Sequence, residues 1–178
     1  VKTIIFITLI HGTLIPITNW LQSKNKKFSV YTGDDKEASE EGFEDSLDEF
    51  INGETEILVA TIQCAGTGID GLQSVCNKAV FFQLPWTSTE FEQSVGRLDR
   101  DGTEFDSVEV FLPITYLDLP NGDVWSWCES KLERIRSKKD IAKASVDGDL
   151  PESGSMISPQ EATKYWLKWL ERLESDDS

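Results

Sequence analysis

Short aliphatic runs alternate with helix-like segments along this chain, and the alternation narrows the possible folds more than any other feature. Thr3–Ile10 is a continuous β-branched and aliphatic run, which is typical of a strand buried on both faces. Further strands are expected at Phe28–Tyr31, Glu56–Thr61, Ala79–Gln83 and Val108–Ile114. Because helical segments separate most of these strands, the pattern predicts an α/β fold of three layers, with helices on both faces of a mostly parallel sheet.

Helical periodicity marks the segments between the strands. One helix is expected to begin near Gly12 and to pass Leu21. In an acidic segment further on, Phe43, Leu47 and Phe50 recur at helical spacing, so one stripe is apolar and the acids lie on the opposite side. We therefore interpret this acidic stretch as a solvated helix over a buried stripe.

Two capping boxes predict where later helices begin. Thr87–Glu90 opens a helix that is expected to continue to about Arg100, and Ser158 opens the last helix. Between them the sequence predicts a helix over 123–143. A stretch near 145–155 is rich in Gly, Ser and Asp and is interpreted as a linker.

The net charge of −15 argues at first against a nucleic-acid partner. The excess of acids lies in two segments, 34–56 and 147–178, whereas acids and bases balance in the remainder. The remainder can therefore present a local positive site.

Three cysteines and one histidine exclude much chemistry. Their number and spacing fit neither a disulfide framework nor a zinc site, so no metal ligands are predicted, and reduced thiols favour an intracellular, cytoplasmic protein. The longest apolar run is far below the roughly 20 residues that a membrane helix needs, so no membrane association is expected. Val1 in place of an initiator methionine indicates a piece of a longer protein.

A glycine-rich segment follows the third expected strand, at the carboxyl edge where parallel sheets bind ligands. The strand ends in Thr61, and Gly66, Thr67, Gly68 and Asp70 follow. Two glycines let backbone N–H groups approach an anion closely, and threonine hydroxyls add donors for a phosphate. A tight turn without a ligand is the alternative.

A second segment carries two arginines on the helix that the first capping box opens. Gln93, Arg97 and Arg100 are spaced so that all three project from one helical face. Two guanidinium groups and an amide suit a polyphosphate, because the planar guanidinium binds oxygens in pairs and stays charged. The alternative is a surface helix whose arginines pair with Glu90, Glu92 or Asp101.

Taken together, the two segments resemble a known family. V-A-T-x₄-G-x-G-I-D, a strand and then Q-x-x-G-R-x-x-R are similar to the fifth and sixth motifs of superfamily-two helicases. Within that superfamily the chain looks most like the Swi/Snf-type DNA translocases, since Trp86 precedes the arginine helix and Gly102 follows its second arginine. The opening strand and Y31-T-G-D also fit, and the resemblance covers roughly residues 1–143.

The resemblance implies a second RecA-like lobe over 1–120, followed by a helical extension over 121–178. In such a lobe, Arg97 and Arg100 would reach the γ-phosphate of ATP held by the first lobe. As arginine fingers they would raise the rate by roughly 10³–10⁵. Gln93 would orient that arrangement.

The resemblance also implies separate roles for the glycine segment. Gly68 and Asp70 would link ATP to the nucleic acid. The backbone of the DNA would be contacted by a set of small and hydroxyl residues after the strands: Thr61, Gly66, Thr67, Gly12, Thr32 and Gly33.

The phosphate-cradling loop G-x-x-x-x-G-K-[ST] and an acidic magnesium segment are absent from the sequence. Mg²⁺ would therefore be held by a first motor lobe of the same polypeptide, and this chain alone, expected to be monomeric, would hydrolyse no ATP. Asp101 and Thr103 depart from the pattern of eukaryotic chromatin remodellers, which favours a bacterial, archaeal or phage member. Two alternatives remain: an RNA-directed lobe, and a non-catalytic module that docks a protein.

Overall fold

The computed structural model describes residues 2–32, 40–118 and 122–147. The chain divides into two compact units, Val1–Ile135 and Arg136–Ser178. The first unit contains the sheet and every predicted site residue. The predicted division into 1–120 and 121–178 remains a prediction.

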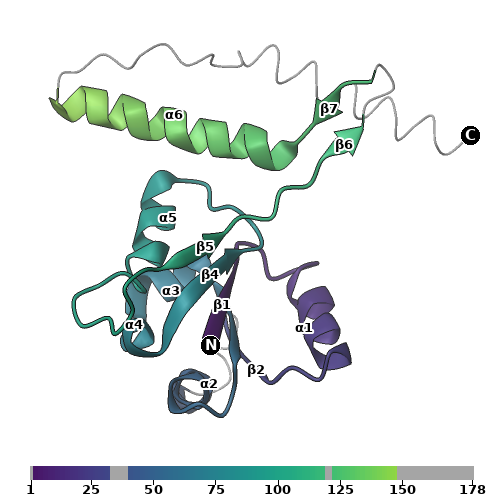
Figure 1. Ribbon diagram of the computed structural model, residues 1–178, viewed down its shortest axis with the longest axis vertical. Coiled ribbons are helices and arrows are strands. Elements are labelled where there is room, and N and C mark those ends of the chain that lie inside the picture. Colours follow the sequence, from purple (N-terminus) through teal and green to yellow (C-terminus); the bar gives the residue numbers. More distant parts are fainter. Residues whose placement is uncertain (1, 33–39, 119–121, 148–178) are drawn as a thin grey trace, which may run out of the picture. The chain divides into compact units, whose positions relative to one another are not determined.

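Five parallel strands form the central sheet, in the order β2-β3-β1-β4-β5 (Figure 1). Their bounds are Lys2–Ile7 for β1, Phe28–Tyr31 for β2, Ile57–Thr61 for β3, Cys76–Phe81 for β4 and Glu109–Phe111 for β5. Each pairing within this sheet is parallel, which confirms the predicted sheet type.

Six helices accompany the strands within the described residues. They are α1 Leu14–Ser23, α2 Glu40–Asn52, α3 Ile62–Gly68, α4 Leu72–Val75, α5 Ser88–Val95 and α6 Trp127–Asp147. The acidic segment forms α2, as its spacing predicts, and Phe50 of its apolar stripe is fully buried.

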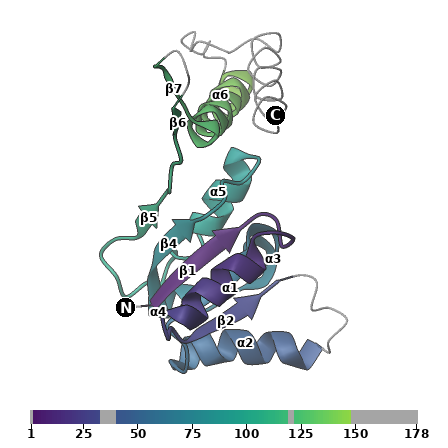
Figure 2. The same ribbon diagram turned by 90° about the vertical axis from the view of Figure 1, so that its right-hand side faces the viewer.

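The two faces of the sheet bury different side chains, so the domain has three layers. On one face, Val59 and Ile7 pack with Ile17 and Leu21 of α1, which lies in front of β1 in Figure 2. On the other face, alternate strand residues such as Phe6 join the larger core beneath α2, α3 and α5. Period-two alternation on strands buried on both sides gives this arrangement, and it confirms the predicted α/β architecture.

The first strand ends earlier than its apolar run predicts. β1 stops at Ile7, not at Ile10. The carbonyl of Ile10 accepts hydrogen bonds from Thr13 and Leu14, which begins the turn into α1. The aliphatic character of the run continues for three residues, but its backbone has already left the sheet.

A small hairpin replaces the start of the helix that was expected from residue 123. Leu117–Asp118 (β6) and Val124–Trp125 (β7) pair in antiparallel fashion, and α6 begins at Trp127. Because α6 continues to Asp147, the linker expected near 145–155 starts inside a helix. The rest of that linker and the helix expected after Ser158 lie outside the described residues.

Candidate nucleotide and nucleic-acid sites

The capping box at the start of α5 forms as predicted. The hydroxyl of Thr87 accepts a hydrogen bond from the backbone N–H of Glu90 at 3.2 Å. In return, Oε2 of Glu90 accepts from the backbone N–H groups of Thr87 at 3.1 Å and Trp86 at 3.0 Å. Glu90 is thereby engaged in fixing the start of α5.

The end of α5 differs from the prediction. The helix stops at Val95, with Gly96 at its C-cap, whereas it was expected to reach Arg100. The backbone N–H groups of Leu98 and Asp99 both donate to the carbonyl of Val95, at 2.9 and 3.0 Å, and this closes a turn.

Arg97 and Arg100 therefore lie in that turn, on either side of the fully buried Leu98, and do not share one helical face. Gln93 stays on α5 itself, where it is exposed. The prediction of a common helical face for these three residues is wrong. The position of the two arginines depends on how the buried Leu98 anchors the turn in the core.

The turn meets the end of the glycine segment. Nη1 of Arg100 donates to Oδ1 of Asp70 at 2.8 Å, and Nη1 of Arg97 donates to the carbonyl of Ile69 at 3.5 Å. Arg100 and Asp70 are 51% and 80% exposed, so solvent reaches both charges. Two segments about thirty residues apart thus place two guanidinium groups and a carboxylate in one accessible cluster.

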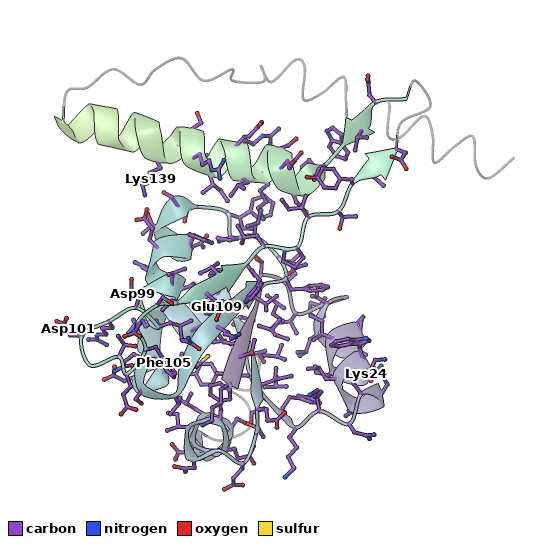
Figure 3. All side chains as sticks on the ribbon, viewed as in Figure 1. Lys24, Asp99, Asp101, Phe105, Glu109 and Lys139 are labelled. Atoms are coloured by element: carbon purple, nitrogen blue, oxygen red, sulfur yellow. The ribbon has the colours of Figure 1, made fainter. Side chains whose placement is uncertain are left out.

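This cluster lies at the opposite edge of the sheet from the one expected. Asp70 precedes α4, and α4 leads directly into the amino end of β4 at Cys76. The turn after α5, where Figure 3 labels Asp99 and Asp101, is joined to Asp70 by the Arg100 contact. α3 and α5 leave the carboxyl ends of their strands and return along the sheet, so residues at their far ends lie near the amino edge.

The glycine segment is helical. Residues expected to form a loop with Gly66 and Gly68 belong to α3, which is anchored by the buried Ile62 and Ala65. Apolar side chains that must face the core therefore decide the backbone here. A glycine loop that wraps an anion is not formed, although Gly68 still leads directly to Asp70.

Thr61 lies at the carboxyl edge of the sheet, with only 5% of its surface exposed. Its Oγ1 is buried and has no hydrogen-bond partner within the part of the chain that the structure describes. Thr32 is also buried, and the parallel pairing of Tyr31 with Ala60 places it at the same edge. Gly12 is exposed, with φ +77°, which favours glycine.

Gly66 and Thr67 lie within α3. Gly33 lies outside the described residues. The predicted site residues therefore fall into two groups. Asp70, Arg97 and Arg100 meet near the amino edge, whereas Thr61, Thr32 and Gly12 follow strands at the carboxyl edge.

Sequence reasoning missed Gln83, which supports the carboxyl edge. Its Oε1 accepts from the backbone N–H groups of Thr8 and Leu9, each at 2.9 Å. Its Nε2 donates to the hydroxyl of Thr13 at 3.0 Å. The sequence shows only that Gln83 is a polar residue at the end of an apolar strand. Its hydrogen bonds to the turn around Gly12 cannot be inferred from that.

Within the described ranges, no group of three or more His, Cys, Asp or Glu side chains is placed to hold a metal ion. The helices described there also lack a stretch long and apolar enough to cross a bilayer.

The sequence model for the family described as helicase conserved C-terminal domain matches residues 1–102, more than half of the chain. A curated relative is the uncharacterized ATP-dependent helicase YqhH of Bacillus subtilis (strain 168). It is 33% identical over 105 residues, which is 59% of this chain and 17% of that protein. The chain therefore spans only a small part of this relative.

Solved structures share the fold at low sequence identity. The C-terminal part of the Fun30 ATPase domain is 16% identical with a TM-score of 0.54, over 84% of this chain and 49% of that one. The C-terminal domain of the DEAD-box protein Dbp5 is 20% identical with a TM-score of 0.54, over 78% of this chain and 69% of that one. S. cerevisiae Dbp5 L327V bound to RNA and ADP BeF3 is 20% identical with a TM-score of 0.55, over 76% of this chain and 32% of that one.

Proposed function

This chain belongs to the helicase conserved C-terminal domain family and has the fold of the second, RecA-like lobe of superfamily-two helicases; from this premise we propose that it serves an ATP-dependent DNA helicase or translocase as its second motor lobe. The observation that carries the proposal is the meeting of Asp70 with Arg100, and of Ile69 with Arg97. Two sequence motifs that resemble helicase motifs converge there on one solvent-accessible cluster.

The cluster has the chemistry that a terminal phosphate requires. Arg97 and Arg100 offer planar, permanently charged donors, which bind phosphate oxygens and stabilise the charge that develops during transfer. ATP, when it is bound, supplies the phosphoryl group that is transferred to water. Asp70 holds one guanidinium in place, and Gln93 at the preceding helical turn orients the arrangement.

The carbonyl of Ile69 and the carboxylate of Asp70 compete with phosphate for the two arginines, but only weakly. An exposed ion pair contributes about 0–1 kcal/mol. A triphosphate carries more negative charge than one carboxylate, so it displaces Asp70 when a first lobe presents it. In this proposal a first lobe of the same polypeptide holds Mg²⁺, as the family resemblance implies.

Nucleic acid is bound, in this proposal, at the other edge of the sheet. The buried Oγ1 of Thr61, which has no partner among the described residues, supports this, because such groups in native proteins nearly always have one. Thr32 follows β2, Gly12 lies in the turn after β1, and both strands pair with β3. Thr67, Gly66 and Gly33 complete the set that the family resemblance implies. A small shift of α3 would expose the Thr61 hydroxyl to a phosphate.

The track is DNA in this proposal, because the spacing of the motifs resembles that of Swi/Snf-type translocases. RNA is the alternative track. The Arg100–Asp70 pair also favours one other function, a non-catalytic interaction module, since it leaves one arginine already neutralised.

ATP hydrolysis by the chain joined to its first motor lobe in one polypeptide tests these proposals. We expect duplex DNA to raise the rate of ATP hydrolysis, and RNA of equal length to raise it less. The chain without the first lobe is the control and should hydrolyse no ATP. A rate that no nucleic acid changes would contradict the motor assignment, and stimulation by RNA alone would reassign the track.

A further inference from the structure

A cavity of 280 Å³ opens beside the carboxyl ends of β1 and β4, within the first compact unit. Its walls are mainly aromatic and aliphatic: Leu9, Phe82, Trp86, Pro113 and Trp127. Four of these side chains are about half exposed or more, between 50% and 56%. Apolar surface of this kind is available to a ligand, and the volume lies just below the roughly 300–1,000 Å³ of pockets for larger ligands. A small planar group fits that size class.

Among the lining residues that the structure describes, Lys131 of α6 is the only charged one. Its ammonium lies 3.9 Å from the centre of the Trp86 ring and donates to the carbonyl of Leu84. Burial lowers the pKa of Lys131 from its ordinary value, while the charge of Glu90 opposes that shift. The chain as a whole is strongly acidic, yet the described residues that line this cavity include no carboxylate. Lys131 therefore offers a positive charge to an anionic ligand beside Trp86, and the nearby Glu90 carboxylate is bonded to the backbone N–H of Trp86.

The cavity adjoins the edge proposed for nucleic acid. Gln83 lines it and donates to Thr13, the residue after Gly12. Thr8 lines it as well and donates from its backbone to Gln83. A strand whose phosphates contact the turn around Gly12 would therefore pass the mouth of the cavity.

We propose that this cavity takes one unstacked nucleobase of the bound strand, with the base stacked on Trp86 and a neighbouring phosphate close to Lys131. The proposal rests on the nucleic-acid contact proposed above and adds a base contact to it. Stacking on an indole accepts every base, because each base has a π-face, so the contact adds affinity without reading sequence. The pre-existing contact between Lys131 and Trp86 holds the indole ready for this role.

Two single strands of equal length separate a base contact from phosphate contacts. One is oligo(dT), and the other carries an abasic site at every position, so it keeps all phosphates and lacks all bases. We measure the affinity of the two-lobe polypeptide for each strand, at one salt concentration. The wild-type protein should bind oligo(dT) roughly 5- to 150-fold more tightly than the abasic strand, which is the range that stacking of one base on an aromatic residue gives.

Trp86→Ala should reduce this preference to near unity by weakening only the binding of oligo(dT), and Trp86→Phe should retain part of it. Trp20→Ala is the matched control, because Trp20 on α1 is 58% exposed against 56% for Trp86. It should keep the full preference. Equal binding of both strands by wild type, or the same preference in Trp86→Ala, would overturn the base site and leave the phosphate contacts standing. Failure to bind either strand would also overturn the base site, whereas the proposed function is tested separately by the stimulation of ATP hydrolysis with duplex DNA.

Discussion

Arg100 and Leu98 show how one short turn combines an accessible charge with a buried anchor. Arg100 is half exposed and bonded to a carboxylate that is more exposed still, whereas Leu98 is fully buried in the core. A solvent-screened ion pair stabilises the fold little, and a buried leucine stabilises it strongly. The fold therefore positions the arginine without depending on its charge for stability.

Two substitutions test this division of roles at the scale of single residues. Leu98→Ala should lower the free energy of unfolding of the chain by about 2–5 kcal/mol, because it leaves a cavity in the core. Asp70→Asn should change it by less than about 1 kcal/mol, because the ion pair that it breaks is exposed. Urea denaturation measures both. A large loss in Asp70→Asn would show that the pair is structural, and it would weaken the case that phosphate can displace it.

Helix α5 carries Gln93 and leads into the arginine turn, so its start sets the geometry of the cluster. The reciprocal hydrogen bonds of Thr87 and Glu90 fix that start. The aromatic rings of Phe81 and Phe91 lie with their centres 4.6 Å apart and tie the helix to β4. A helix of eight residues is too short to hold its position without such contacts.

Removal of the cap tests the contribution of this element. Thr87→Ala should lower the free energy of unfolding by about 0.5–2 kcal/mol, because the backbone N–H of Glu90 loses its acceptor. Thr89→Ala changes an exposed threonine in the first turn of the same helix and serves as control. Thermal unfolding of both variants provides the comparison, and equal losses would show that the capping bond contributes nothing specific.

Elements were predictable where local pattern decides them. The strand at Phe28–Tyr31, the acidic helix and the capping box at Thr87 follow from spacing alone. The end of α5 was not, because Gly96 fits inside a helix and the turn that closes at Val95 depends on burial of Leu98. The helix α3 was also not predictable, because the two glycines favour a loop and long-range packing of Ile62 and Ala65 against the core stabilises the helix.

The candidate site was predictable in composition and not in position. The residue types of the two motifs identified Asp70, Arg97 and Arg100. The sequence predicts these residues at the carboxyl edge of the sheet, but they lie near the amino edge. The order of strands and helices indicates where a strand ends, but not how far the next helix runs back along the sheet. Gln83 was missed since its partners, Thr8, Leu9 and Thr13, are about seventy residues away in sequence.

For the molecule as a whole, the described residues separate two surfaces. The arginine cluster lies near the amino edge of the sheet, and the hydroxyl residues after the strands lie at the carboxyl edge, with α3 running between Thr61 and Gly68. In the proposed motor lobe, ATP hydrolysis at the first surface would have to change the binding of nucleic acid at the second. α3 joins the end of β3 to Gly68, two residues before Asp70, so in the proposed motor lobe it lies between these two surfaces.

The most direct test of the central claim is ATP turnover by the two-lobe polypeptide with Arg97→Ala, Arg100→Ala and, as a matched control, Arg136→Ala, which removes an exposed arginine on α6. Measured at saturating ATP and DNA, both cluster variants should lose roughly 10³–10⁵ in rate, as arginine fingers do. Their affinity for DNA should stay nearly unchanged, and Arg136→Ala should behave as wild type. Turnover that stays at the wild-type rate in both cluster variants would show that these guanidinium groups do not act on the nucleotide.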